Sequence, residues 1–562
     1  MGRMTGNLYY GDNLGVLREN VKDESVDLVY LDPPFNSNAT YNVLFKAHSG
    51  RRSQAQIAAF EDTWHWGNES EAAFLDVLRN PGHAGASNML RALRESLRES
   101  DMLAYLAMMT VRLIELHRVL KPTGSVYLHC DPTASHYLKI IMDRIFGVEN
   151  FRSEIIWQRS TGKALMTRGL PANHDVLLCF QMGERSVWNS GAAFIPYDAN
   201  DLPQKTAAKY SHIDPDGRHY QLDNLINPSP NRPNLTYEFL GITRVWRWTR
   251  DRMEQAQRDG LIVQPGPDRV PRFKRYLDEQ RGMPLGDVWT DIPPLNSQAQ
   301  ERLGYPTQKP LALLERVIKL SSNEGDLILD PFCGCGTTIH AAEKLDRNWI
   351  GMDVTHLAIS LIERRLGDAF PLVDFTVHGT PKDLEGARDL ARRDKYQFQW
   401  WAVSLVDAVP FGGKKKGADS GIDGWRYMAA GRSAVARAVV SVKGGETVGV
   451  QMVRDLRGVM DRENAEAGLL LTLVEPTRPM LEEAAKAGLF DSPFGGRRHP
   501  RLQILTVGAL LLGVRPDLPP LSMDAGFRRA GREDRSIQNQ GSLLGAGGLD
   551  APAVATRKRP AR

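Results

Sequence analysis

The sequence predicts an α/β protein built on a parallel sheet, and two observations support this fold class. Apolar runs typical of buried strands flank a segment of helical periodicity near the start of the chain. Further along, residues 325–354 read as a strand, a glycine turn, a helix and a second strand, which is a complete βαβ unit. The order strand, helix, strand implies parallel pairing.

The first predicted strands are "VDLVYLD" (Val26–Asp32) and "GSVYLHCD" (Gly124–Asp131). Between them lies a helix that "KPTG" ends, and its apolar residues step by three and four: Leu106, Met109, Leu113, Leu116 and Leu120. "SEIIW" and "HDVLLCF" predict further strands. Residues 46–100 are polar and mostly helical-looking, and we interpret them as an insertion over the edge of the sheet.

The chain is expected to hold several domains, because 562 residues exceed one ordinary core. Residues 1–180 and 301–380 carry the alternation of strands and helices, whereas residues 181–300 are rich in proline, asparagine and tryptophan and read as a separate module. Another α/β region is expected over 390–515, from the helix-like "YQFQWWAVSLVDA" and the strand "ARAVVSVKGG". Residues 516–562 lack periodicity and predict a disordered tail.

Composition indicates a globular protein of the cytoplasm with no membrane partner. Hydrophobic residues make up 42% and charged residues 25% of the chain, no apolar run approaches a transmembrane span, and the first residues lack the order of a secretory signal. The four cysteines lack the spacing of a disulfide framework or a zinc site. A net charge of +4 permits an anionic partner without requiring one.

The glycine turn "LILDPFCGCGTT" predicts a nucleoside site. Gly334 and Gly336 follow a strand and precede a helix, where missing side chains let a ligand approach the backbone. About 20 residues later Asp353 ends the next strand, at the position where an acidic side chain binds ribose hydroxyls. Thr337 and Thr338 stand where a diphosphate-binding turn would place further glycine, so a nucleoside without a diphosphate is favoured. The alternative is a tight turn that binds nothing.

The segment "DPPF" predicts a rigid hydrogen-bonding corner at the carboxyl end of a strand. Asp32 would project into the crevice where parallel sheets bind ligands, and Pro33 and Pro34 stiffen the backbone beside it. A carboxylate and a prolyl carbonyl are two acceptors, which suits both protons of an exocyclic amine, and Phe35 offers a face for stacking of a base. Attack of such an amine on a sulfonium methyl group needs no metal. The alternative is an ordinary strand that ends in prolines.

Together these residues resemble a known family, the amino-methylating DNA methyltransferases that use S-adenosylmethionine. "DPPFN" is similar to their catalytic tetrapeptide, "DPFCGCGTT" to their cofactor loop and "YPTQKP" to their third cofactor-binding segment. The catalytic motif precedes the cofactor motif, as in the permuted β group of the family. The resemblance covers roughly residues 6–378 and implies a Rossmann-like methyltransferase sheet, with residues 181–300 as an inserted target-recognition module.

Carried over position by position, the resemblance implies two sets of site residues. The catalytic pocket would be formed by Asp32, Pro33, Pro34 and Phe35. Asp12 would contact the adenine of the cofactor, although "GDN" could also be a plain turn, and residues 307–309 would close over its methionine part. The complete implied cofactor set is Asp12, Thr307, Gln308, Lys309, Asp330, Phe332, Gly334, Gly336, Thr337 and Asp353.

The resemblance also bears on the substrate. An aspartate at the head of the tetrapeptide is similar to adenine-N6 enzymes, whereas serine is more usual for cytosine-N4, so adenine in duplex DNA is preferred. RNA or a protein amide are the other substrates for this chemistry, a DNA-binding subunit with a vestigial pocket is the non-enzymatic alternative, and a homodimer is an expectation from the family. The base would be extruded from the duplex.

Within the module, "RVWRWTR" interleaves arginines with tryptophans. Arg244, Arg247 and Arg250 suit contacts to phosphates, so we predict them to bind DNA. Trp246 and Trp248 suit stacking on bases, or else form the module's own small core. The recognised DNA sequence does not follow from these residues.

"GADSGIDGW" followed by "VVSVKGG" resembles the core of PD-(D/E)xK restriction endonucleases. The resemblance implies Asp423 as a ligand of Mg²⁺, Lys443 as the residue that stabilises charge, and Asp419 as an accessory carboxylate. Ser441 departs from the pattern, because the family has an acidic residue or glutamine there. Three interpretations stay open: an active nuclease fused to the methyltransferase, a decayed nuclease that still binds DNA, and an α/β interaction module.

Overall fold

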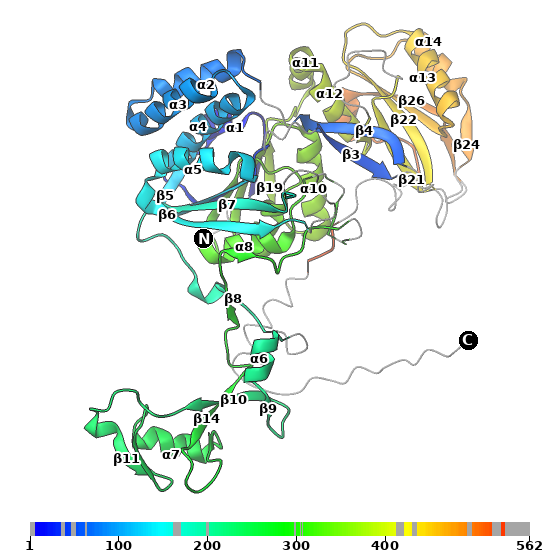
Figure 1. Ribbon diagram of the computed structural model, residues 1–562. Coiled ribbons are helices and arrows are strands. Elements are labelled where there is room, and N and C mark those ends of the chain that lie inside the picture. Colours follow the sequence, from blue (N-terminus) through cyan, green and yellow to red (C-terminus); the bar gives the residue numbers. More distant parts are fainter. Residues whose placement is uncertain are drawn as a thin grey trace. The chain divides into compact units, whose positions relative to one another are not determined.

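Figure 1 shows the computed structural model of the protein. The structure describes residues 6–34, 40–46, 52–61, 65–160, 170–197, 202–296, 299, 301–303, 305, 307–411, 421–429, 435–491, 497–519 and 530–533. The chain divides into two compact units. One comprises Met1–Trp188 together with Asp287–Arg562, and the other is Asn189–Gly286.

The first unit contains a nine-stranded sheet within its described residues. In spatial order its strands are β16 (Val288–Trp289), β6 (Phe151–Gln158), β7 (His174–Gln181), β5 (Leu120–Cys130), β2 (Val26–Leu31), β17 (Leu327–Asp330), β18 (Asn348–Asp353), β1 (Gly6–Tyr10) and β19 (Phe375–His378). Neighbours from β5 to β19 pair in parallel, whereas β7 is antiparallel to both of its neighbours. The parallel α/β sheet predicted from the sequence is therefore confirmed, with an antiparallel strand near one edge.

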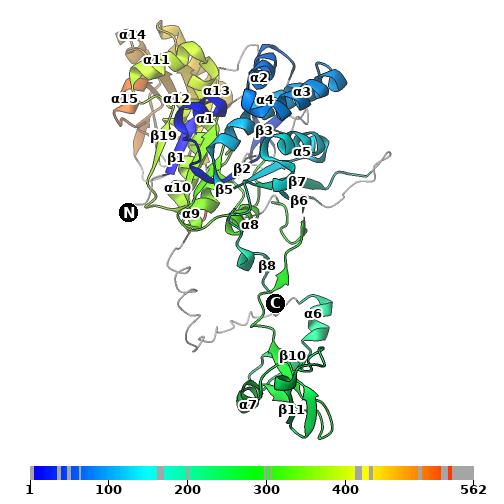
Figure 2. The ribbon, with the colours of Figure 1, turned by 90° about the vertical axis from the view of Figure 1, so that its left-hand side faces the viewer.

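Five helices from the first half of the chain cover one face of this sheet, and Figures 1 and 2 show them grouped together. They are α1 (Asn13–Asn20), α2 (Asn68–Leu78), α3 (Ala84–Leu97), α4 (Asp101–Val119) and α5 (Pro132–Phe146). The predicted helix is α4, which the Ser100 hydroxyl caps by accepting a hydrogen bond from the Leu103 N–H at 3.3 Å. It packs against inward-facing residues of the strands, such as Val29 and Leu128, to form the main core.

A hairpin lies between β2 and α2 in the chain, where the sequence predicted mostly helical structure. Strands β3 (Thr40–Lys46) and β4 (Arg52–Glu61) pair antiparallel, so the prediction is wrong for residues 52–61. The segment "QAQIAAFE" holds good helix formers, but cross-strand pairing decides the conformation of such segments more strongly than local propensity does.

The βαβ unit near residue 330 is present as predicted. Strand β17 leads through the glycine turn into α9 (Thr337–Lys344), and β18 leads into α10 (His356–Ala369). The preceding helix, α8 (Leu311–Ser321), corresponds to the periodic segment "PLALLERVIKLSS". These elements bring the carboxyl ends of β17 and β18 next to each other.

The second unit, Asn189–Gly286, is built from short elements around a small core. A four-stranded antiparallel sheet contains β13 (Ile262–Val263), β14 (Arg272–Tyr276), β10 (His219–Asn224) and β9 (His212–Ile213). A hairpin of β11 (Thr236–Phe239) and β12 (Ile242–Val245) and the helix α7 (Arg250–Arg258) complete it, together with α6 (Gln204–Lys209). Where the chain enters and leaves this unit, β8 (Phe194–Ile195) pairs antiparallel with β15 (Met283–Pro284).

A second sheet, with helices on both of its faces, follows in the first unit after residue 383. Its described strands form a five-stranded sheet in the order β20 (Val409–Pro410), β21 (Gly424–Ala429), β22 (Val435–Lys443), β23 (Ala467–Thr472) and β26 (Leu502–Thr506). Helices α11 (Leu384–Arg393), α12 (Lys395–Ser404) and α15 (Val507–Leu511) pack on one face, and α13 (Val450–Glu463) and α14 (Arg478–Ala485) on the other. Adjacent residues of β22, Val439 and Val440, accordingly belong to opposite cores.

Parts of the predicted disordered tail make defined contacts. Asp517 accepts a hydrogen bond from His499, with Nδ1 and Oδ1 3.0 Å apart, and Glu533 contacts helix α9 through His340. The prediction is wrong for these residues, and most of 520–562 lies outside the described residues. In the described part of the chain, no helix has the length and apolar character needed to cross a membrane.

Candidate active site

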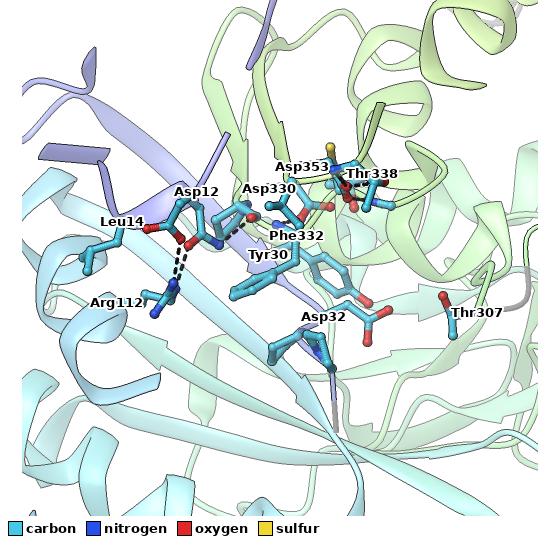
Figure 3. A pocket seen from close by; sticks show the side chains of 18 of the residues that line it. Asp12, Leu14, Tyr30, Asp32, Arg112, Thr307, Asp330, Phe332, Thr338 and Asp353 are labelled. Carbon is cyan, nitrogen blue, oxygen red and sulfur yellow. Dashed lines mark hydrogen bonds and ion pairs between the residues drawn. The ribbon is translucent and has the colours of Figure 1, made fainter. Parts of the chain in front are cut away.

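A cavity of about 730 Å³ opens at the carboxyl ends of four adjacent parallel strands, β2, β17, β18 and β1 (Figure 3). Residues that directly follow these strands line it: 32–34 after β2, 331–335 after β17, 354–355 after β18 and 11–14 after β1. Parallel strands end at the same edge of a sheet, so residues from distant parts of the chain meet here. The predicted carboxylate corner and the predicted glycine turn therefore line one cavity.

The two glycines of the turn have different tasks. Gly334 lines the cavity and has a φ of +49°. Gly336, with a φ of +74°, caps α9, and a Cβ atom placed there would lie 2.7 Å from Cγ1 of Ile362 on α10. The first glycine leaves room toward the cavity, whereas the second permits close packing of two helices.

Buried carboxyl groups hold this turn. Asp353 Oδ2 accepts a hydrogen bond from the Gly334 N–H at 3.0 Å, and its Oδ1 accepts two from Thr355, from the N–H and the hydroxyl, both at 2.8 Å. Burial raises the pKa of Asp353 to about 6 and that of Asp330 to about 7. Asp330 Oδ1 accepts a hydrogen bond from the Phe332 N–H at 3.0 Å, and Phe332 lines the cavity. Both acids are thus poised to change charge near neutral pH.

Arg112 of α4 joins the ends of β1 and β17, and sequence analysis missed it. Its Nη2 donates to Asp12 Oδ1 at 2.7 Å and its Nε to Asn13 Oδ1 at 2.6 Å, while Asn13 Nδ2 donates to the Pro331 carbonyl at 2.8 Å. The one available signal was a guanidinium within the apolar periodicity of α4, where Arg112 is 5% exposed. Asp12 lines the cavity and is the partner of this arginine, and its predicted contact with an adenine stays a prediction.

The carboxylate of Asp32 forms an ion pair with the ammonium of Lys309, and both side chains are largely buried. Asp32, Pro33 and Pro34 line the cavity, and Phe35 lies outside the described residues. Sequence analysis placed Lys309 beside the methionine part of a cofactor. The geometry joins it to the predicted catalytic carboxylate, and its contact with a cofactor stays a prediction.

The neighbours of Lys309 in the "YPTQKP" segment differ in position. Thr307 lines the cavity, as does Thr337 of the glycine turn. Gln308 does not: its Oε1 accepts from the Leu303 N–H at 2.8 Å, and its Nε2 donates to the Glu301 carbonyl at 2.6 Å. The prediction that Gln308 faces a cofactor therefore does not match its position, and its amide instead holds the loop that precedes α8.

A buried hydrogen-bonded chain lies behind Asp32, and sequence analysis missed it as well. The Tyr30 hydroxyl donates to His129 Nδ1 at 2.8 Å, and His129 Nε2 donates to Asp175 Oδ2 at 3.1 Å. Burial would raise the pKa of Asp175, but the His129 hydrogen bond and the charges of Lys309 and Arg159 lower it overall. Tyr30 lines the cavity, so this chain connects the cavity wall to a buried negative charge.

In the second unit the three predicted DNA-binding arginines are exposed. Arg247 Nε donates to the Ile226 carbonyl at 3.2 Å, and Arg250 lies 3.9 Å from Glu254. Trp246, in contrast to these exposed arginines, is fully buried in the small core. Its Nε1 donates a hydrogen bond to the Tyr237 carbonyl at 2.8 Å. Of the two interpretations of the tryptophans, stacking on bases is wrong for Trp246.

The C-terminal sheet brings one predicted nuclease residue, Asp423, next to the strand that ends in another, Lys443. Asp423 lies beside β22, where its Oδ2 accepts from the Val442 N–H at 2.6 Å and from the Ser441 hydroxyl at 3.4 Å, and Lys443 ends the same strand. Asp419 lies outside the described residues. Within the part of the chain that the structure describes, no group of three His, Cys, Asp or Glu side chains could hold a metal ion. Of the two predicted carboxylates, the described residues include only Asp423, and by itself it fits Mg²⁺ poorly.

Comparison with known proteins places the chain in a family. A model of the DNA methylase family matches residues 26–364, and a restriction endonuclease model matches residues 390–490. Type II methyltransferase M.EcaI of Enterobacter cloacae is 28% identical over 397 residues, which cover 70% of this chain and 76% of the relative. The DNA adenine methyltransferase YhdJ of Escherichia coli is 22% identical over 365 residues, which cover 65% of this chain and 84% of the relative.

Among solved structures, a putative DNA modification methylase of Thermus thermophilus in complex with S-adenosyl-L-methionine shows 16% identity and a TM-score of 0.30, over 66% of this chain and 99% of that chain. The match to the DNA methylase model spans more than half of the present chain. The protein therefore belongs to the N6/N4 DNA methylase family, and a restriction-endonuclease-type domain follows its methylase domain.

Proposed function

We propose that the protein transfers a methyl group from S-adenosylmethionine to the exocyclic N6 amine of adenine in duplex DNA. One observation carries this proposal: the rigid carboxylate corner at Asp32 and the glycine turn at Gly334 line the same cavity. A methyl donor bound at the turn would lie within the same space as an amine held at the corner. YhdJ, a relative described as a DNA adenine methyltransferase, supports adenine as the target.

The charges of the cavity fit this methyl donor. Six carboxyl groups and two cationic side chains line it: Asp12, Asp32, Glu69, Asp76, Asp330 and Asp353, and Arg112 and Lys309. S-adenosylmethionine supplies a methyl group on a positively charged sulfur and also carries an ammonium group. Nearby positive charge favours the ionised form of a carboxyl group, so the raised pKa values of Asp330 and Asp353 would fall when such a ligand binds.

Each cavity residue then has a role that follows from its position. Asp353 would accept hydrogen bonds from ribose hydroxyls, since a carboxylate has lone pairs beyond those it gives to Gly334 and Thr355. Gly334 leaves space for the ligand against the backbone. Phe332 and Thr307 would line its flanks.

Asp32 would prepare the nucleophile. An aromatic amine reacts poorly because its lone pair is delocalised, and acceptors that hold its two protons stabilise the positive charge that develops during attack. The amine nitrogen gains the methyl carbon and loses one proton, which Asp32 is positioned to receive, while the sulfur keeps the electron pair of the broken bond. Lys309 would hold the carboxylate of Asp32 in its orientation until the amine arrives.

The target base must leave the duplex to reach this corner, at a cost of a few kcal/mol. We expect the arginines of the second unit, Arg244, Arg247 and Arg250, to contribute phosphate contacts that offset part of this cost.

The decisive experiment is mass spectrometry of nucleosides from DNA treated with the protein and S-adenosylmethionine. N6-methyladenine supports the proposal, N4-methylcytosine would move the target to cytosine, and the absence of any methylated nucleoside over a broad set of sequences would contradict it. Asp32→Ala should abolish transfer and leave binding of S-adenosylmethionine within about twofold. A homodimer stays a prediction, which the mass in solution tests.

A second candidate function belongs to the C-terminal domain. Asp423, Ser441 and Lys443 lie together at the end of β22, and this domain matches a restriction endonuclease model. Cleavage of DNA here would make the chain a fused restriction–modification enzyme. Because serine replaces an acidic ligand, we infer that any cleavage is slow and depends on high Mg²⁺.

A further inference from the structure

A buried guanidinium supports the glycine turn from behind. Arg365 of α10 is 3% exposed, and its Nη1 donates to the Cys335 carbonyl and to the Thr337 hydroxyl, both at 3.1 Å. Cys335 and Thr337 both line the cavity. The position of this arginine therefore decides where one wall of the proposed methyl-donor site lies.

The same guanidinium is joined to a carboxylate near the end of the chain. Arg365 Nε donates to His340 Nδ1 at 3.2 Å, and His340 Nε2 lies 3.1 Å from Glu533 Oε1. Glu533 Oε2 also pairs with the ammonium of Lys344 at 3.2 Å, and its N–H donates to the Ala369 carbonyl at 3.0 Å. Three elements, α9, α10 and residues 530–533, thus meet around one imidazole.

The hydrogen bonds fix the tautomer of this imidazole. An arginine can only donate, so Nδ1 of His340 must accept, and the proton must lie on Nε2, from which it is donated to Glu533. Burial lowers the pKa of His340, and the His340 hydrogen bond lowers the pKa of Glu533, which agrees with a neutral ring beside an ionised carboxylate. The negative charge of Glu533 therefore acts on the buried guanidinium through a neutral ring.

A second contact of the same segment points to the cavity. Ala530 packs on a cluster that includes Leu303, Leu357 and Tyr305, and Tyr305 lines the cavity. Residues 530–533 therefore touch two parts of the cavity wall indirectly, the glycine turn through Arg365 and the loop before α8 through Tyr305.

We propose that Ala530 and Glu533 form a clasp that positions the methyl-donor site, with Glu533, His340 and Arg365 as positioning residues. Of these three residues, only His340 lies within a matched family model. Arg365 and Glu533 lie outside both, since the two models match residues 26–364 and 390–490. The proposal rests on the proposed function, because it assigns the affinity for S-adenosylmethionine to a segment that follows the endonuclease-type domain.

The test compares full-length variants by two measurements. Glu533→Gln keeps the shape of the side chain and removes its charge, and Arg532→Gln, at an exposed neighbouring residue, is the matched control. Calorimetry should show about tenfold weaker binding of S-adenosylmethionine in Glu533→Gln, as expected for a lost charge-assisted hydrogen bond, and no change in the control. In turnover assays the KM for S-adenosylmethionine should rise by a similar factor while kcat at saturation stays constant.

Variants of His340 separate positioning from simple loss of structure. The amide of His340→Gln can accept a hydrogen bond from Arg365 and donate one to Glu533. This variant should therefore keep an affinity for S-adenosylmethionine within about twofold of the wild type, whereas His340→Leu should bind it more weakly. Equal affinities for S-adenosylmethionine in Glu533→Gln and Arg532→Gln would overturn the clasp. Equal affinities in His340→Gln and His340→Leu would overturn it as well.

The second measurement is independent of the methyl donor. Amide hydrogen exchange at residues 333–338 in the ligand-free protein should be faster in Glu533→Gln than in Arg532→Gln, and equal rates would overturn the clasp. If wild-type protein does not bind S-adenosylmethionine at all, the proposed function fails, and the exchange rates alone then decide whether the clasp holds the turn.

Discussion

The ammonium of Lys309 pairs with the carboxylate of Asp32 across 277 positions of the chain. The pair joins the segment before α8 to the end of β2, and it lies on the wall of the cavity. A cation at this place changes the interpretation of the segment "YPTQKP", because its lysine contacts the residue that we propose to hold the target amine.

Lys309→Gln should therefore affect the chemical step. Without the ammonium, Asp32 loses the charge that orients it, so we expect kcat to fall about tenfold or more while the KM for S-adenosylmethionine changes less than about twofold. Steady-state kinetics of methyl transfer measure both. The reverse pattern, a raised KM with an unchanged kcat, would return Lys309 to a role in binding the methyl donor.

The two glycines of the turn should respond differently to alanine. Gly336→Ala places a Cβ atom 2.7 Å from Ile362 at a φ of +74°, so the free energy of unfolding should fall by about 2 kcal/mol. Gly334→Ala meets its nearest atom at 3.5 Å and should cost less stability, but it narrows the cavity and should weaken binding of S-adenosylmethionine. Denaturant titration and calorimetry on both variants check this, and similar losses of stability would contradict the assignment.

Stability should depend on pH through Asp330. Burial raises its pKa to about 7, so the folded protein keeps this proton at pH values where the unfolded chain has lost it. The resulting stabilisation is complete below the ordinary pKa of an aspartate and is lost as the pH rises through 7. The melting temperature of Asp330→Asn minus that of the wild type should therefore increase by about 2 °C when the pH is raised from about 5.5 to about 8.5. A difference that is constant over this range would argue against a buried carboxyl group that titrates.

The chain from Tyr30 through His129 to Asp175 should contribute strongly to folding. His129→Phe keeps a ring but leaves the buried carboxylate of Asp175 without this donor, so we expect a loss of about 3 kcal/mol in unfolding free energy. Tyr30→Phe removes only a hydroxyl, and its cost should be about 1 kcal/mol. Urea denaturation followed by fluorescence compares the two, and equal costs would show that the charge of Asp175 is satisfied without His129.

The C-terminal domain gives a further prediction. Unmethylated plasmid should be nicked slowly in Mg²⁺, and the activity should vanish in Lys443→Ala and in Asp423→Ala. Arg478→Ala, on an exposed part of α14, serves as a control for folding of the same domain. DNA that stays intact over many substrates and Mg²⁺ concentrations would favour a DNA-binding or interaction role instead.

The parts of the site that sequence analysis anticipated share one property. Asp32, Gly334 and Asp353 each follow or end an apolar strand-like run, so local pattern places them, and the geometry of a parallel sheet places them together. Arg112, His129 and Asp175 could not be found in this way. Arg112 contacts Asn13 across 99 positions of the chain, and His129 contacts Asp175 across 46, and no local periodicity reports such a pairing.

Two further misses have local causes. Segment 52–61 is rich in helix formers, yet it pairs with β3, so tertiary pairing overrides propensity there. Glu533 stands in a stretch with the composition of a disordered tail, and composition over tens of residues does not reveal a single anchored carboxylate. The sequence does not decide between two roles for Trp246, because an aromatic ring among arginines suits both a core and a stacking surface.

The pairing of β8 with β15 has a consequence for how this protein can change. Because Ile195 and Met283 are paired neighbours on adjacent strands, the chain departs and returns at almost the same point in space. A foreign segment whose two ends lie one strand spacing apart could be spliced between them without moving the large sheet. Exchange of this one cassette is therefore a route by which the unit Asn189–Gly286 could be replaced while the strands that line the cavity are inherited unchanged.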